Sequence, residues 1–457
     1  MKPKNFYDTD VVVLGGGPGG SAAALTAANA GLKTAIIDPC EPGGTCLNRG
    51  CVPAKTWLAV EHLYRRSKWS EAIGGGPPVR YDYKKIREHQ KNVIRLGQKS
   101  LSSVFRRKGI EWITGTAAFT SDRTIEIDGG AKKINFKHAV IATGSQPIEL
   151  FGGIENSYNS DNIFSIQDFP SSIVIIGGGA CGVEMAAFFG GMDCRVTLIE
   201  ALVDILPAED AEMRSVVKRE FKKTGVTIKT GVAVQSAIGK NGGCAVEADD
   251  GTVTAGDALL SAIGRMAQTE PLRLDKAGVR TDVKGFIEVD GAMGTSREGI
   301  YAVGDVTGKS LLAYTAHHEG IVAGRSITGR SAAMDYRFVP SIVFTNPEIG
   351  SVGSTEEELR QMGTHYRAGR YYVRALARAQ ASGEIAGIIK VLVGEDKSIL
   401  GVHIAAPGAT ELIHVGVAAM RAGMKADDLA DTVFGHPTLS EAIPLAAADA
   451  LGISVYS

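Results

Sequence analysis

Long hydrophobic runs, an excess of one charge sign and abundant cysteine are all missing from this chain of 457 residues. No apolar run reaches the roughly 18 residues needed to span a bilayer, and no apolar signal region precedes the first predicted strand, so we expect a cytoplasmic protein without a membrane span. The 49 Lys and Arg balance the 50 Asp and Glu, which argues against nucleic acid as a general partner. Six cysteines are too few for a disulfide scaffold.

Apolar residues and glycine are plentiful. Hydrophobic residues make up 44% of the chain, so it can bury a sizeable core, and its length suits roughly three domains of about 100–200 residues. The 57 glycines suit tight turns and close approach of the backbone to ligands. The composition therefore predicts a folded protein with several domains.

A strand, a glycine-rich turn, a helix and a second strand open the chain. The predicted order is Val11–Leu14, Gly15–Gly20, Ser21–Ala30 and Lys33–Ile37, and the second strand ends at Asp38. This order is typical of a dinucleotide-binding unit, in which backbone N–H groups at the helix start meet a pyrophosphate and the acid meets a ribose hydroxyl.

The same pattern returns later in the chain. A strand at Ile173–Ile176 precedes the turn Gly177–Gly182, a helix over Val183–Gly190 and a strand over Arg195–Ile199 that ends at Glu200. A carboxylate at this position accepts a hydrogen bond from a free 2′-hydroxyl and repels a 2′-phosphate, which favours NAD over NADP. The alternative is a duplicated scaffold that binds nothing.

Cys46 and Cys51 stand with four residues between them, just before a predicted helix. A disulfide across so short a loop is constrained and easily reduced. The helix start would stabilise a thiolate at Cys51, and Lys55 adds positive charge. Taken alone, the pair would more often indicate two buried structural cysteines or half of a zinc site. No second cysteine pair supplies further zinc ligands, and we expect no metal.

Two long polar helices are predicted over residues 55–110. Their basic residues indicate a solvated face or a docking surface for an acidic partner. After Tyr336 the pattern changes to separate strands, such as Ser341–Phe344 and Ile388–Val393, followed by helices over Ala409–Ala422 and Ala426–Leu429. This tail predicts an α+β module.

His436 and Glu441 form the last candidate pair, in the run His-Pro-Thr-Leu-Ser-Glu. A carboxylate bonded to one imidazole nitrogen raises the basicity of the other. His317 and His318 lack such a setting, and we interpret them as ordinary histidines.

Five blocks in order give the chain a resemblance to the pyridine nucleotide–disulfide oxidoreductases, class I. They are the first glycine turn, GGTCLNRGCVPAK at 43–55, GGGACGVE at 177–184, TSREGIYAVGD at 295–305 and HPTLSE at 436–441. The resemblance covers essentially the whole chain. It implies an α/β fold with two Rossmann-like domains, for FAD and NAD, and a C-terminal α+β dimerisation domain. The implied ranges are 1–147 (FAD-binding, first part), 148–266 (NAD-binding), 267–335 (FAD-binding, second part) and 336–457 (interface).

The resemblance also implies which residues bind each cofactor. Those expected to bind FAD are Gly15, Gly17, Gly20, Asp38, Lys55, Thr143, Gly144, Asp305, Leu312 and Ala313. Those expected to bind NAD are Gly177, Gly179, Gly182, Glu200 and Gly264.

Cys46, Cys51, His436, Glu441, Lys55 and Glu184 are the catalytic residues that the resemblance implies. Lys55 would pair with Glu184 near the flavin, and His436 of one subunit would serve the disulfide of the other in a homodimer. The implied reaction oxidises dihydrolipoamide on a lipoylated carrier protein, or in a 2-oxoacid dehydrogenase complex, and passes hydride to NAD⁺. The alternatives are another NAD(P)H-dependent disulfide reductase of the family, or a docking or structural flavoprotein subunit of a multienzyme complex.

Three positions depart from the usual pattern. Arg49 lies between the cysteines where many relatives carry a smaller apolar residue, and it either shifts the thiolate pKa and reduction potential or points to solvent. Tyr314 stands where relatives often have His, and Phe434-Gly435 precedes the catalytic His. These departures bear on substrate preference and leave the reaction class unchanged.

Overall fold

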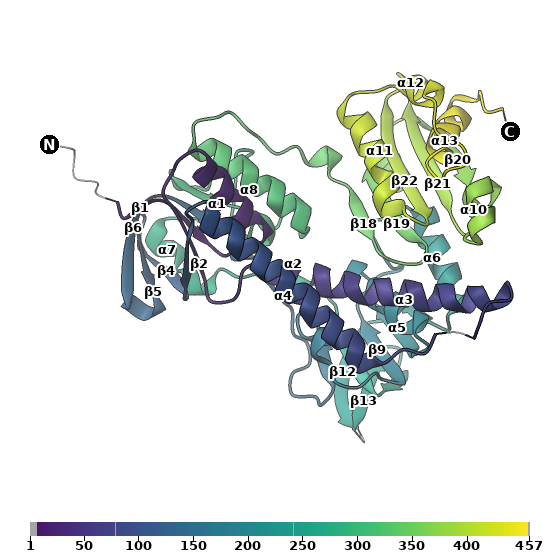
Figure 1. Cartoon of the computed structure of the whole chain (residues 1–457), viewed down its shortest axis with the longest axis horizontal. Coiled ribbons are helices and arrows are strands. Elements are labelled where there is room, and N and C mark those ends of the chain that lie inside the picture. Colours follow the sequence, from purple (N-terminus) through teal and green to yellow (C-terminus); the bar gives the residue numbers. More distant parts are fainter. Residues whose placement is uncertain (1–6, 78, 241, 456–457) are drawn as a thin grey trace.

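The computed structural model describes residues 7–77, 79–240 and 242–455, and these form three sheet-containing parts bridged by long helices (Figure 1). The first six residues, within the segment expected to lack a signal region, and the last two of the expected interface range lie outside this description. Among the described helices, none combines the length and the apolar character that crossing a membrane would require. The mixed α/β architecture confirms the predicted fold class.

The first sheet has seven strands and carries the N-terminal glycine turn. Strands β3, β2, β1 and β6 are parallel in that order, β17 is parallel to β6, and β5 and β4 continue antiparallel. The strands are β1 Thr9–Leu14, β2 Thr34–Asp38, β3 Glu111–Thr114, β4 Ala117–Ser121, β5 Thr124–Ile127, β6 Lys132–Ile141 and β17 Ile300–Ala302.

Helices α1 (Pro18–Asn29) and α8 (Ala313–Ile327) pack against each other beside this sheet (Figure 1). They approach closely because glycines occupy the crossing: a Cβ on Gly320 would lie 2.2 Å from the carbonyl oxygen of Gly19. The first helix starts at Pro18, three residues before the predicted Ser21 and within the predicted glycine turn. The first residues of both helices, Pro18 and Ala313, lie at the same cavity.

The second parallel sheet runs in the order β11-β10-β9-β15-β8, and a three-stranded antiparallel sheet, β12-β13-β14, lies beside it. Helices α5 (Ala180–Gly191) and α6 (Ala211–Lys223) belong to this part. The strands are β8 Ser157–Asn159, β9 Ser172–Ile176, β10 Arg195–Glu200, β11 Thr227–Thr230, β12 Val234–Lys240, β13 Gly243–Ala248, β14 Val253–Gly256 and β15 Ala258–Ser261. The chain enters and leaves through an antiparallel pair, β7 (Ser145–Pro147) and β16 (Arg265–Ala267).

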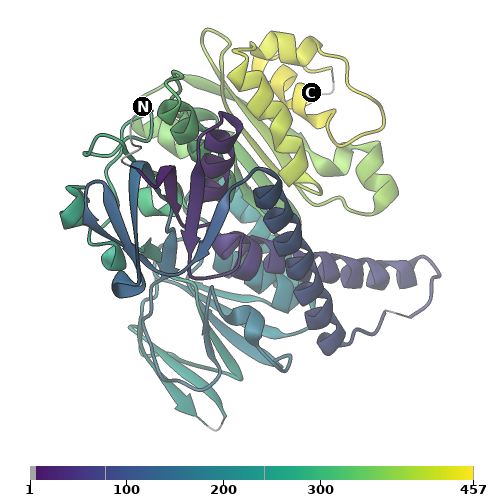
Figure 2. The ribbon, with the colours of Figure 1, turned by 60° about the vertical axis from the view of Figure 1, so that its left-hand side comes forward.

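The C-terminal part is a five-stranded antiparallel sheet with helices packed against it (Figure 2). The strand order is β18-β19-β22-β21-β20. An antiparallel sheet with separate helices is the α+β module that the sequence predicts. The strands are β18 Ser341–Val343, β19 Glu348–Gly353, β20 Tyr366–Tyr372, β21 Ile388–Gly394 and β22 Ile399–Ala406. The helices are α9 Glu356–Gln361, α10 Ala377–Ser382, α11 Ala409–Arg421, α12 Ala426–Asp431 and α13 Ala442–Leu451.

The two long helices are α3 (Cys51–Ala72) and α4 (Tyr83–Arg107), and the short helix α2 (Gly44–Arg49) precedes them. A further short helix, α7 (Leu274–Ala277), contacts strand β4 of the first sheet. Trp57 of α3 is fully buried and stacks on Phe188 of α5, with ring centroids 4.7 Å apart. An aromatic contact of this kind anchors α3 to the second sheet domain.

The basic residues of these helices do not form one solvated face. Arg65 and Arg66 pair with Glu384 at 3.4 and 3.5 Å, and Lys68 pairs with Asp193 at 2.7 Å. The prediction was therefore wrong for α3, whose cations contact neighbouring parts of the chain, since spacing along a helix does not reveal distant acids. On α4 the exposed cations include Lys84, Lys85, Arg106 and Arg107.

A buried ionic cluster joins the second part to the C-terminal sheet. Lys390 of β21 is 1% exposed, and its Nζ lies 2.7 Å from Asp210 Oδ1 and 3.0 Å from Glu356 Oε1. Asp210 also caps α6 by accepting the backbone N–H of Glu212. The cluster compensates one buried cation with carboxylates from two domains.

Candidate active site

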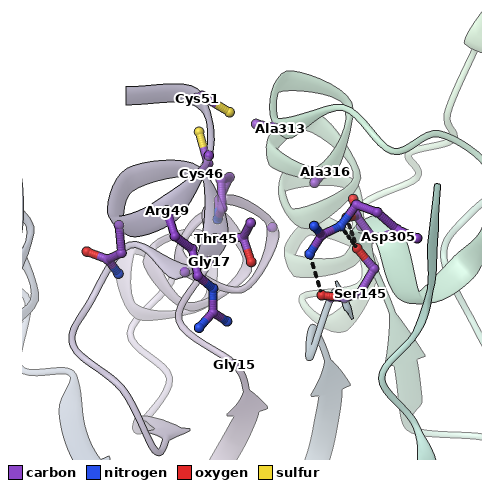
Figure 3. A pocket seen from close by; sticks show the side chains of 18 of the residues that line it. Gly15, Gly17, Thr45, Cys46, Arg49, Cys51, Ser145, Asp305, Ala313 and Ala316 are labelled. Carbon is purple, nitrogen blue, oxygen red and sulfur yellow. Dashed lines mark hydrogen bonds between the residues drawn. The ribbon is translucent and has the colours of Figure 1, made fainter. Parts of the chain in front are cut away.

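One large cavity, about 1010 Å³, lies where the first and second parts and the start of the C-terminal part meet. Its walls contain the glycine turn before α1, helix α2, the start of α3 and the start of α8 (Figure 3). The expected residues that line it are Gly15, Gly17, Asp38, Cys46, Cys51, Lys55, Thr143, Gly144, Glu184, Gly264, Asp305, Leu312 and Ala313.

The turn before α1 leaves the helix start open to the cavity. Gly15 has a φ of +105°, and a Cβ there would lie 2.3 Å from Ala142 O. A Cβ on Gly20 would lie 1.9 Å from Gly15 O, so helix and strand can pack only if both are glycine. Gly17 is the N-cap and has no side-chain cap. Free backbone N–H groups at such a helix start favour an anionic group.

Asp38 ends β2 at the edge of the cavity, as predicted. Its Oδ2 accepts the N–H of Gly16 at 2.6 Å and its Oδ1 accepts the N–H of Cys40 at 2.8 Å. Burial raises its pKa, which these hydrogen bonds and the charge of Arg49 partly oppose. The carboxylate therefore holds the turn in shape while it faces the cavity.

The two cysteines are free thiols that both line the cavity. Cys46 lies in α2 and Cys51 is the first residue of α3, the helix-start position that its sequence context predicts. A hydrogen bond from the Cys46 thiol, together with the charge of Lys55 and against the opposing effect of burial, lowers the pKa of Cys51 to about 7. The same hydrogen bond and burial raise the pKa of Cys46. Of the two sulfurs, Cys51 is therefore the one that more readily forms a thiolate.

Lys55 and Glu184 meet across two domains, as predicted. The Lys55 Nζ donates to Glu184 Oε2 at 2.7 Å and lies 4.3 Å from the ring centroid of Phe344. The other carboxylate oxygen, Oε1, accepts the N–H of Phe344 at 3.0 Å. This contact ties the dithiol helix to α5 and to the chain that follows β18.

The opposite wall of the cavity is a chain of polar contacts. Asp305 Oδ2 accepts the Ser145 hydroxyl at 2.5 Å, and Arg265 Nε donates to the same hydroxyl at 2.7 Å (Figure 3). Arg265 Nη1 also lies 2.6 Å from Asp161 Oδ1. Sequence reasoning missed Arg265, although its position directly after Gly264 was an available signal.

The remaining predicted flavin-site residues lie on the same wall. Thr143 Oγ1 donates to Gln268 O at 2.7 Å, and a Cβ on Gly144, whose φ is +72°, would project into open space. Helix α8 begins at Ala313, after Leu312, without a side-chain cap, so its positive end faces the cavity.

The second glycine turn repeats the geometry of the first. Gly177 has a φ of +105°, and a Cβ on Gly182 would lie 1.9 Å from Gly177 O, while a Cβ on Gly179 would meet nothing. Glu200 Oε2 accepts the N–H of Gly178 at 2.5 Å. Of the residues expected to bind NAD, Gly264 lines the large cavity, whereas Gly177, Gly179, Gly182 and Glu200 are not part of its described lining.

His436 and Glu441 meet each other but stay outside the cavity lining. His436 Nδ1 lies 2.8 Å from Glu441 Oε2, and Glu441 Oε1 accepts the N–H of Thr438 at 3.2 Å. The His436 side chain is 70% exposed. Within one chain, the Glu441 carboxylate therefore orients the His436 imidazole, which is exposed at the protein surface.

The comparisons with known proteins agree along the whole chain. Residues 9–320 match the pyridine nucleotide-disulphide oxidoreductase family, and residues 339–447 match the dimerisation domain of that family. The chain belongs to the pyridine nucleotide-disulphide oxidoreductases.

Several similar curated proteins are named dihydrolipoyl dehydrogenase, and others are named leghemoglobin reductase. Dihydrolipoyl dehydrogenase of Thermus scotoductus is 37% identical over 454 residues, covering 97% of each chain. The enzyme of that name from Geobacillus stearothermophilus is 34% identical over 458 residues, covering 98% of this chain and 97% of its own. Among solved structures, LpdA of Mycobacterium tuberculosis matches with a TM-score of 0.89 at 26% identity, covering 96% of this chain and 99% of its own. The HOCl-induced flavoprotein disulfide reductase RclA of Escherichia coli gives 0.87 at 26%, with the same coverage.

The residues present fit FAD, which with NAD is the cofactor set of this family. The cavity is large enough for an extended dinucleotide, and its glycine turn leaves space where a Cβ at position 17 would intrude. The start of α8 offers a positive helix end to the same cavity.

Proposed function

We propose that this protein oxidises protein-bound dihydrolipoamide to lipoamide and reduces NAD⁺, through FAD and the Cys46–Cys51 pair. The observation that carries the proposal is the position of the Cys46 and Cys51 thiols together in the wall of the dinucleotide cavity. Full-length similarity to dihydrolipoyl dehydrogenases, at 34–37% identity, supports the substrate.

The chain's residues divide the reaction between them. His436, oriented by Glu441, takes a proton from one substrate thiol. The substrate thiolate attacks Cys46 of the oxidised pair, the Cys46–Cys51 bond breaks, and Cys51 leaves as a thiolate. The second substrate thiol then displaces Cys46, which closes the lipoyl disulfide and leaves the enzyme with two sulfurs reduced by two electrons. Bound FAD supplies the electron-pair carrier between this dithiol and NAD⁺.

Lys55 and Glu184 support the electron-transfer side of the site. Lys55 stabilises the Cys51 thiolate, and Glu184 fixes the ammonium group in place. Gly177, Gly179, Gly182, Gly264 and Glu200 would hold NAD, with the Glu200 carboxylate selecting the free 2′-hydroxyl.

The active protein is a homodimer in this proposal, because His436 is exposed and outside the cavity lining of its own chain. His436 of one subunit serves Cys46 of the other, through the interface domain of residues 336–457. The ranges 1–147 and 267–335 then form the FAD-binding domain and 148–266 the NAD-binding domain. The lipoyl group comes from a separate carrier protein, as in a 2-oxoacid dehydrogenase complex, in the cytoplasm.

The test measures NAD⁺ reduction by the yellow holoprotein with dihydrolipoamide and with a lipoylated carrier domain. Parallel assays with NADPH and glutathione disulfide separate this function from another disulfide reductase of the family. Turnover with dihydrolipoamide and NAD⁺, well above the other pairs, is the expected result. Absence of lipoamide turnover in flavin-loaded dimer would refute the proposal.

A further inference from the structure

Arg49 ends α2, one helical turn after Thr45, so the two side chains lie on the same face of this helix. The start of α2 touches the glycine turn: a Cβ on Gly44 would lie 2.6 Å from Gly17 Cα. Thr45, Arg49 and Gly17 all line the large cavity. The face of α2 that carries Arg49 therefore borders the open start of α1.

The guanidinium of Arg49 points away from the sulfurs. Figure 3 shows the sulfur atoms of Cys46 and Cys51 at one end of the cavity, while the Arg49 side chain extends toward Gly17 and Gly15. The electrostatic effects agree, since Arg49 lowers the pKa of Asp38, beside the glycine turn, whereas the charges that act on Cys51 are those of Lys55 and Glu184. Of the two predictions for Arg49, control of the thiolate receives no support.

The Arg49 guanidinium forms an ion pair with one oxygen of the Asp161 carboxylate. Arg49 Nε lies 3.1 Å from Asp161 Oδ2, but at an angle that makes no hydrogen bond. Arg265 already holds the other oxygen of Asp161 at 2.6 Å. Two guanidinium groups, those of Arg49 and Arg265, therefore share the Asp161 carboxylate. The Arg49 side chain is 43% exposed and is free to turn its remaining donors to a ligand.

We propose that Arg49 binds the diphosphate of FAD, together with the free N–H groups at the start of α1 and the hydroxyl of Thr45. A guanidinium matches phosphate geometry with paired donors, and a helix start next to it favours the same anion. The chain thereby replaces an apolar neighbour of the disulfide with a phosphate ligand. The inference rests on the FAD site of the proposed function and adds a contact that retains the cofactor.

Release of FAD from the holoprotein tests the inference. Free flavin fluorescence would be followed after dilution at 20 and 500 mM KCl for wild type, Arg49→Gln and Arg49→Lys. The control is Arg106→Gln, which removes an exposed arginine of α4. Loss of a charge-assisted hydrogen bond at a half-exposed site predicts about tenfold faster release for Arg49→Gln at low salt. The difference shrinks at high salt, where phosphate and cation are screened.

Arg49→Lys should retain FAD better than Arg49→Gln, because it keeps the charge, and Arg106→Gln should match wild type. Release from Arg49→Gln at the wild-type rate, at both salt concentrations, would overturn the inference. So would equally fast release from Arg49→Gln and Arg49→Lys, which would indicate a packing defect. Because release is measured without substrate, the result stands apart from the lipoamide assay: wild-type protein that retains FAD without turnover would refute the function alone.

Discussion

Lys55 and Glu184 are 129 positions apart in sequence, yet the Lys55 Nζ donates to Glu184 Oε2 at 2.7 Å. The lysine lies one turn after Cys51, and the glutamate lies on the helix that follows the second glycine turn. Their charges act on the Cys51 thiolate in opposite directions, since Lys55 lowers its pKa and Glu184 raises it. The pair therefore exerts two opposing electrostatic effects on the Cys51 thiol.

Substitution of either partner should move the Cys51 titration in a predictable direction. Lys55→Met removes the cation that lowers the Cys51 pKa, so that pKa should rise above about 7, and Glu184→Gln should lower it. The measurement is the pH profile of Cys51 alkylation by iodoacetamide in the reduced holoprotein, resolved by peptide mass spectrometry, because only the thiolate reacts. Shifts of the same sign in both variants would contradict this account.

Cys46→Ala should raise the pKa of Cys51 more than Lys55→Met does. The hydrogen bond from Cys46 is the largest cause of the lowered value, and alanine removes it. The same alkylation profile measures the shift, with Cys40→Ala as the control because it removes an exposed cysteine outside the pair. An unchanged Cys51 profile in Cys46→Ala would show that the Cys46 thiol does not lower the Cys51 pKa.

His436→Gln should lose dihydrolipoamide turnover by about 10²–10⁴-fold, the usual contribution of a general base. Electron transfer from NADH to an artificial acceptor should change little, because that half of the reaction needs no proton from the substrate thiol. Steady-state rates of the two assays provide the comparison, and His414→Gln, an exposed histidine on α11, is the control. Equal losses in both assays would argue against the assigned base.

Lys390→Met should destabilise the protein by about 3–5 kcal/mol, because it leaves buried carboxylates without their cation. Lys397→Met breaks an exposed pair with Asp427, which solvent screens, and should change the unfolding midpoint far less. Denaturant unfolding at pH 7 measures both. Near-equal midpoints for the two variants would show that the buried cluster contributes nothing special.

The same cluster should make stability sensitive to acid. Burial raises the pKa of Asp210, but the hydrogen bond from Lys390, the charges of His403 and Lys390 and the backbone N–H of Glu212 together hold it below its ordinary value of 3.8. A carboxyl with a depressed pKa contributes stability above its ordinary pKa, and that contribution is lost as the pH falls through the folded value. Unfolding measured from pH 7 to below 4 should therefore show a steeper loss in wild type than in Lys390→Met.

The sequence by itself determined the two strand–turn–helix–acid units and the place of the dithiol at a helix start. These features are local: Gly15 and Gly177 need positive φ and have no room for a Cβ, and this requirement is visible in the spacing of residues. The α+β character of the tail is visible for the same reason, since strand and helix periodicities are local.

Only the tertiary structure decided where long side chains point and which distant groups they meet. In the folded chain, the Arg49 side chain extends toward the glycine turn and away from the sulfurs. Arg65 and Arg66 form ion pairs with Glu384, and His436 is exposed beside Glu441. A flexible, charged side chain can reach many positions from one place in the sequence. Which position it takes depends on partners that folding brings from elsewhere in the chain, and for His436 on a second subunit in the function proposed above.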